Sequence, residues 1–104
     1  MINLKKLQEE TEAQIVLLAH KNGTIIESLN TEYGENIALM TEASLSMCGD
    51  LLKDVAGGNI KQLIARSDKN YIIANKIESD LIVLIVSDKL PKFGLVMKHM
   101  NSLK

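Results

Sequence analysis

Two short runs of uninterrupted apolar residues, residues 15–19 and 81–86, constrain the fold of this chain more than any other feature. A strand with one face in water alternates between apolar and polar side chains. A run without alternation therefore predicts a strand that is buried on both faces. The two runs predict two central strands of a single sheet, with other strands outside them and helices on both faces.

A predicted β-hairpin follows the first run. Asn22 and Gly23 accept the positive φ values of a tight type I′ turn, and β-branched residues are frequent in residues 24–29. This second strand should pair with the first and lie outside it. His20 falls at the end of the first strand, beside the turn.

One long helix is predicted over residues 35–56, where apolar side chains recur every three or four positions until Gly57 and Gly58 end the pattern. A first set of these side chains shares one helical face and should pack in the core: Ile37, Met40, Met47, Cys48, Leu51 and Val55. A second set widens the apolar arc to roughly half the circumference: Ala38, Leu45, Leu52 and Ala56. That arc is wider than one sheet needs, so a second partner is expected.

Three further strands and two terminal helices complete the prediction. Residues 60–65, 71–77 and 81–86 are separated by turn compositions and predict an antiparallel meander. With the two apolar strands adjacent, the strand order is 2-1-5-4-3. Pro91 opens a helix with Phe93, Val96, Met97, Met100 and Leu103 on one face, and Ile2, Leu4 and Leu7 give a weaker helical pattern within residues 1–12.

The third strand is the outermost one and carries Lys61 and Gln62 but no proline. Its unpaired backbone N–H and C=O groups can form hydrogen bonds with a strand of another chain. Together with the wide apolar arc of the long helix, this edge predicts a homodimer with a symmetric contact. The expected interface residues come from the strand and the helix: Ile60, Lys61, Gln62, Leu63, Ile64, Ala38, Leu45, Leu52 and Ala56.

Composition narrows the class of protein. A chain of 104 residues fits one domain, residues 1–104, and a single cysteine excludes an internal disulfide. With no signal-peptide pattern, we expect a cytoplasmic protein. The longest apolar run is far shorter than a membrane span, so membrane insertion is not expected. A net charge of −1, scattered basic residues and three aromatic residues argue against nucleic acid as a partner.

The reactive side chains of the sequence are isolated from one another. His20 and His99 have no acidic or sulfur companion at metal-ligand spacing, so we interpret His20 as the end of a strand rather than a ligand or general base. Cys48 lies within the long helix, where a small buried side chain is favoured over an activated nucleophile. The methionines of the two helices are interpreted as core, although methionine also forms plastic binding faces.

The remaining candidates are a glycine pair and an arginine. Gly57, Gly58 and Asn59 follow a helix, whereas a phosphate loop precedes one, so they are predicted to cap the helix end. Arg66 ends the edge strand, where a solvated side chain is favoured over an arginine that stabilises a transferred phosphoryl group. We therefore predict no catalytic residue, no cofactor and no metal, and a non-enzymatic protein.

The order hairpin, long helix, three-strand meander and terminal helix resembles the roadblock family, the dynein light-chain roadblock-type domains and their prokaryotic relatives, over residues 12–104. The resemblance is carried by "VLLAHKNGTIIES", the helix of residues 36–56, "YIIANKIESDLIVLIVSD", and "PKFGLVMKHM" with Gly94 near the start of the last helix. Asn22 stands where the family commonly has Asp, and both residues tolerate the turn.

The resemblance implies an α+β fold of profilin-like or longin-like topology, with a five-stranded antiparallel sheet, the long helix on one face and the terminal helices on the other. It also implies a dimer through the third strand and the long helix, and a role in docking or regulating a small Ras-like GTPase. The polar side of the long helix is then the candidate docking surface: Glu42, Ser46, Asp50 and Lys53. Two alternatives remain, a scaffold subunit that leaves nucleotide hydrolysis unchanged and a small-ligand sensor.

Overall fold

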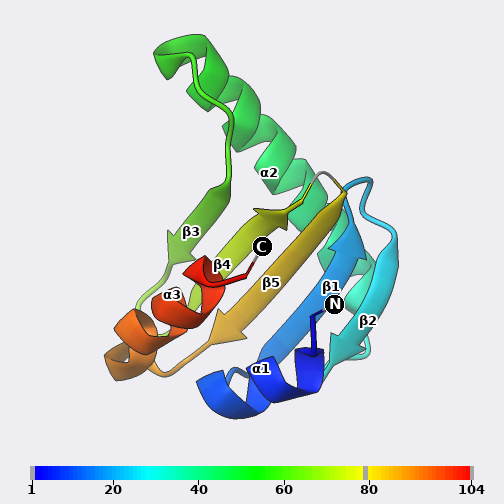
Figure 1. The fold of residues 1–104 in the computed structure, drawn as a ribbon, viewed down its shortest axis with the longest axis vertical. Coiled ribbons are helices and arrows are strands. Elements are labelled where there is room, and N and C mark those ends of the chain that lie inside the picture. The colour runs from blue at the N-terminus through cyan, green and yellow to red at the C-terminus, as the bar shows by residue number, and fades with distance from the viewer. Residues whose placement is uncertain (1, 79, 104) are drawn as a thin grey trace.

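The computed structural model describes residues 2–78 and 80–103 and has one antiparallel sheet in the order β2-β1-β5-β4-β3 (Figure 1). The strands are β1 (Ile15–His20), β2 (Ile25–Leu29), β3 (Gln62–Arg66), β4 (Tyr71–Ile77) and β5 (Leu81–Ser87). Helix α2 (Gly34–Ala56) lies on one face. Helices α1 (Leu4–Thr11) and α3 (Phe93–Asn101), the latter preceded by the 3-10 turn η1 (Leu90–Lys92), lie on the other. The predicted fold class and strand order are confirmed.

The two apolar runs form the centre of the sheet. β1 and β5 pair antiparallel, with Leu17 opposite Leu84, and the middle residues of both strands are buried. The side chains alternate between two hydrophobic clusters, one under α1 and α3 and the other under α2. Each central strand therefore contributes to two cores, which is why its sequence shows no polar alternation.

The hairpin forms as predicted and contacts α2, but its turn is not the predicted type I′, because Asn22 is not among the described residues with positive φ and the turn runs from His20 to Gly23. Gly23 has φ +89°, and its N–H donates to the carbonyl oxygen of His20 over 2.9 Å. A Cβ added to Gly23 would lie 2.9 Å from Cδ2 of Leu39, so glycine is needed both for the turn and for the approach to the helix. The turn thus docks beside the N-terminal half of α2.

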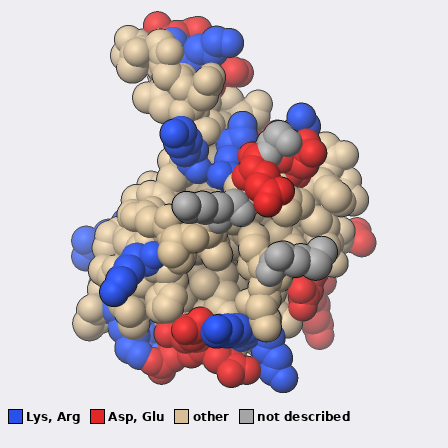
Figure 2. Space-filling model, viewed as in Figure 1, with Lys and Arg blue, Asp and Glu red and all other residues tan. Residues whose placement is uncertain are grey.

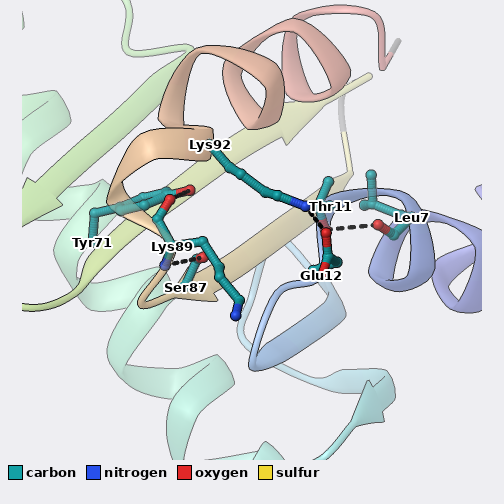
Figure 3. Close-up of polar contacts among 7 residues, drawn as sticks. All are labelled: Leu7, Thr11, Glu12, Tyr71, Ser87, Lys89 and Lys92. Carbon is teal, nitrogen blue, oxygen red and sulfur yellow. Dashed lines mark hydrogen bonds and ion pairs between the residues drawn. The ribbon is translucent and has the colours of Figure 1, made fainter.

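The α1 and α3 face is closed by apolar packing and by polar contacts (Figure 3). Leu4, Leu7, Val96 and Met100 are almost fully buried against the sheet. An ion pair joins Glu12, just after α1, to Lys92 at the start of α3. The two terminal helices are therefore tied to each other as well as to the sheet.

The connection from β5 to α3 is fixed by a second group of contacts in the same view. The Ser87 hydroxyl oxygen accepts from the Lys89 N–H over 3.0 Å, and the Tyr71 hydroxyl donates to the Lys89 carbonyl oxygen over 3.4 Å. The Tyr71 ring packs edge-on against Phe93, with 5.0 Å between ring centroids. Pro91 lies in η1, so the α-helix begins two residues later than Pro91 itself.

The predicted core face of α2 is wrong. The buried residues of this helix are Gly34, Ala38, Thr41 and Leu45, whereas four of the six side chains expected in the core are largely exposed, namely Met40, Met47, Leu51 and Val55. Ile37 and Cys48 are half-buried. The helix contacts the sheet through a face that is turned away from the expected one and that carries its smaller side chains.

The C-terminal part of α2 projects beyond the sheet (Figure 1). Residues 50–56 are all exposed, although this segment includes Leu51, Leu52 and Val55. The chain then turns at Gly57, which has φ +78° and donates its N–H to the Lys53 carbonyl oxygen over 2.9 Å, as predicted for a helix cap. It returns beside the helix before it enters β3.

Candidate interaction surface

An exposed apolar stripe runs along one side of α2. Met40, Met47, Leu51 and Val55 are 62%, 73%, 64% and 78% exposed, and we call these four residues the α2 stripe. Their spacings of seven, four and four residues align them on one side of a helix. Large apolar side chains gathered in this way on a surface indicate a contact with another molecule.

The β3 strand is an open edge of the sheet. The Lys76 N–H donates to the Lys61 carbonyl oxygen over 2.9 Å, which defines a hydrogen-bonded pair between the two strands. Because such pairs alternate along an antiparallel ladder, Leu63 and Ala65 also direct their backbone groups at β4. Gln62, Ile64 and Arg66 therefore direct theirs outward, where none of the described residues forms a further strand.

The α2 stripe and the β3 edge meet at a pocket of about 420 Å³. The pocket lies between the projecting end of α2 and the chain that leads into β3, and its lining is mostly apolar: Cys48, Leu51, Leu52, Val55, Ile60 and Gln62. Gly49 allows the two segments to approach, since a Cβ there would lie 2.9 Å from Cγ2 of Ile60. The stripe, the pocket and the edge therefore form one continuous surface.

The structure corrects two of the predicted dimer-interface residues. Ala38 and Leu45 are 0% and 3% exposed and pack in the cluster under α2, so they offer no surface to a partner. Leu52 is 41% exposed and Ala56 is exposed. The other predicted interface residues lie on the β3 side of the surface, where Lys61 and Ile64 are exposed and the rest are half-buried: Ile60, Gln62 and Leu63.

The polar docking residues lie on another side of α2. Ser46, Asp50 and Lys53 are exposed, and Glu42 is half-buried beside the hairpin turn, where its Cβ would lie 3.5 Å from a Cβ added to Gly23. Their helical positions place them away from the α2 stripe. The structure brings these four residues together along one helix side, and their role in docking stays a prediction.

The candidate reactive residues do not come together in a site. His20 is exposed and ends β1, as predicted, while His99 is half-buried on α3. Within residues 2–78 and 80–103, no group of three or more His, Cys, Asp or Glu side chains is arranged to hold a metal ion. Arg66 is exposed at the end of β3. Cys48 is not fully buried, in contrast to the prediction, because it borders the pocket beside the α2 stripe.

Charge does not mark a separate site on the face that carries α1 and α3. In Figure 2, Lys and Arg side chains lie among Asp and Glu side chains along the lower rim and around the base of the projecting end of α2. The ion pair between Lys21 and Asp80, at 3.6 Å, is highly exposed at both ends and contributes little to stability. None of the helices in the described parts of the chain is long and apolar enough to cross a membrane.

Comparison with known proteins relates the chain to others through its fold. No protein-family model matches the sequence, and no curated protein matches it at the level of sequence. Among solved structures, Myxococcus xanthus MglB has a TM-score of 0.83 and 20% identity, with 92% of this chain and 80% of that chain covered. An MglB with a tetrameric arrangement also has a TM-score of 0.83, with 14% identity and coverage of 94% and 76%.

A Roadblock/LC7 domain from Streptomyces avermitilis is similar over almost its whole length. Its TM-score is 0.74 at 10% identity, and 96% of each chain is covered. Identities this low show the fold alone. The resemblance to the roadblock family is thus confirmed at the level of the fold, which this chain shares with MglB and Roadblock/LC7 domains.

Proposed function

We propose that this chain is a homodimeric interaction module that docks a small Ras-like GTPase and alters its nucleotide cycle or its location. The observation that carries the proposal is the exposed α2 stripe beside the open β3 edge. A large apolar surface next to unpaired backbone groups is costly for an isolated chain in water, and a second copy covers both features at once.

The proposed dimer pairs β3 with β3 of a second copy in antiparallel register. Gln62, Ile64 and Arg66 have the outward backbone groups, so a two-fold axis at Ile64 joins Ile64 to its own copy and Gln62 to Arg66. This register places no like charges opposite each other along these three positions. The two α2 helices then lie on the same face of a continuous sheet, each stripe beside the other helix.

Self-association also occurs in a protein of this fold, the MglB with a tetrameric arrangement. For the present chain it remains a proposal, because the likeness is one of fold. Static light scattering at tens of micromolar protein tests it directly. A molecular mass of one chain, against 11.5 kDa from the sequence, contradicts the dimer.

The proposed GTPase contact lies on the paired α2 helices. Ser46, Asp50 and Lys53 are exposed there and leave the stripe available for the second copy. The resemblance to the roadblock family supports a GTPase as the partner. With no catalytic group assigned to this chain, an effect on hydrolysis acts through the switch loops of the GTPase itself, which requires different affinities for its GTP and GDP states.

The test uses nucleotide dependence as its readout. The tagged protein is incubated with lysate of the source cell, in parallel with a non-hydrolysable GTP analogue and with GDP, and captured proteins are identified by mass spectrometry. We expect a small GTPase mainly with the GTP analogue, and reduced capture by the charge-reversal variant Asp50→Lys/Lys53→Glu. Capture of partners without nucleotide dependence instead supports the scaffold alternative, and capture of no GTPase contradicts the proposal.

A further inference from the structure

The methionines of this chain differ sharply in exposure. Met40 and Met47 are 62% and 73% exposed on the α2 stripe, whereas Met97 is half-buried and Met100 is 0% exposed beneath α3. The two exposed thioethers lie on the surface that the proposed dimer buries. We propose that Met40 and Met47 are reversible oxidation sites, and that their conversion to methionine sulfoxide dissociates the proposed dimer.

The chemistry needs one oxidant, a peroxide. A lone pair of the thioether sulfur attacks one oxygen of hydrogen peroxide, and the O–O bond breaks as the S–O bond forms. The departing hydroxide takes the proton from the transferred oxygen and leaves as water. Sulfur loses two electrons and the peroxide gains them, so the reaction is balanced without a metal or a cofactor. Reduction of the sulfoxide by a thiol-dependent sulfoxide reductase restores the thioether.

Accessibility selects the two sites. Met40 and Met47 have most of their side-chain surface in solvent, while Met100 lies in the cluster formed by α1, α3 and the sheet. The inference rests on the proposed self-association, in which both stripe residues become covered. Oxidation then acts on the dissociated copy, so that a higher protein concentration should protect Met40 and Met47 and leave the slow oxidation of Met100 unchanged.

The effect of the oxygen atom follows from its position. The α2 stripe is apolar along its length, and a sulfoxide places a strongly polar S–O group in the middle of it. A polar group buried without a hydrogen-bond partner is costly, so we expect each sulfoxide to weaken self-association by about tenfold or more. The fold of the chain should persist, because neither side chain contributes to the two core clusters.

The experiment compares oxidation with assembly in the same samples. A Cys48→Ser variant, which lacks the thiol that also reacts with peroxide, is compared with the parent throughout, because Cys48 borders the pocket beside the stripe. Protein is treated with millimolar hydrogen peroxide at several protein concentrations, sulfoxide is mapped by peptide mass spectrometry, and molecular mass is measured by light scattering. We expect oxidation of Met40 and Met47 before Met100, loss of the dimer after oxidation, and recovery of the dimer after sulfoxide reductase treatment.

The matched control is Met40→Leu/Met47→Leu, which keeps the stripe apolar and removes both thioethers. Its dissociation constant is measured first without peroxide, and that value should not change when peroxide is added. A dimer of the parent that persists with both methionines oxidised overturns the switch and leaves the proposed function intact. A parent that is monomeric before treatment overturns the self-association itself, and the two failures are thus distinguished.

Discussion

The two halves of α2 have similar apolar composition, but all of the buried residues of the helix lie in the N-terminal half. In the N-terminal half, Ala38, Thr41 and Leu45 are buried against the sheet. In the C-terminal half, Leu51 and Val55 are 64% and 78% exposed, on a segment with no sheet beneath it. The difference shows that an apolar pattern does not specify which of its side chains the chain itself buries.

The largest expected effect comes from truncating one leucine in each half. Leu45→Ala should lower the free energy of unfolding by about 2–5 kcal/mol, because Leu45 is 3% exposed and leaves a cavity. Leu51→Ala should change the stability of the monomer by less than about 0.5 kcal/mol. Urea denaturation at protein concentrations low enough for the monomer measures both values. An equal loss in the free energy of unfolding for the two variants would show that Leu45 and Leu51 contribute equally to the stability of the monomer.

The next prediction concerns assembly. Met47→Asp places a charge on the stripe and should weaken self-association by about a hundredfold or more, since a charge in a desolvated apolar contact is expensive. Its matched control is Ser46→Asp, one position earlier on the polar side, which should leave the dimer intact. Analytical ultracentrifugation across a concentration series measures both dissociation constants. A dimer that tolerates Met47→Asp but not Ser46→Asp would place the contact on the polar side of α2.

The edge strand provides a backbone test of the same surface. Ile64 directs its N–H outward, so Ile64→Pro removes no hydrogen bond within the chain but blocks pairing with a second β3. Ala65 directs its N–H to β4, so Ala65→Pro removes a hydrogen bond of the sheet and should cost the monomer about 1–3 kcal/mol. Light scattering and thermal melts separate the two effects. Loss of monomer stability in Ile64→Pro equal to that in Ala65→Pro would refute the assigned register.

The sheet was predictable from the sequence because its signals are local. Uninterrupted apolar runs mark strands buried on both faces. The Asn22-Gly23 pair marks the place of the hairpin, although the predicted turn type is wrong. The strand order followed from these runs, and the structure has the same order.

The orientation of α2 was not predictable from apolar periodicity. Its wheel has two overlapping apolar arcs, and either one satisfies the rule that apolar side chains are buried. The face that meets the sheet carries three small residues, Gly34, Ala38 and Thr41, together with Leu45. At Gly34 the approach is close, since an added Cβ would lie 2.6 Å from the Ser28 hydroxyl oxygen. The larger side chains of the other arc, including Met47 and Leu51, are left outside.

The lengths of α2 and of the strands indicate that α2 extends beyond the sheet, which the apolar pattern does not indicate. A helix of 23 residues is about 34 Å long, while a strand of 7 residues spans about 23 Å. One end of α2 therefore has to extend past the sheet. The polar residues Glu42, Ser46, Asp50 and Lys53 have no comparable signal, because exposed polar side chains are normal on any helix, so their role depends on the family resemblance and on the capture experiment.

The smallest expected effect lies where the exposed half of α2 ends, at two adjacent glycines that both have open space around them. Gly57 has φ +78°, so Gly57→Ala should cost about 1 kcal/mol through backbone strain alone. Gly58 has no positive φ, and Gly58→Ala should be neutral or stabilising by a few tenths of a kcal/mol. Denaturation curves of the two variants at low protein concentration make the comparison. An equal loss in the free energy of unfolding for both variants would show that the left-handed conformation of Gly57 does not stabilise the end of α2. The packing of Ile60 on Gly49 would then be what positions the chain between α2 and β3.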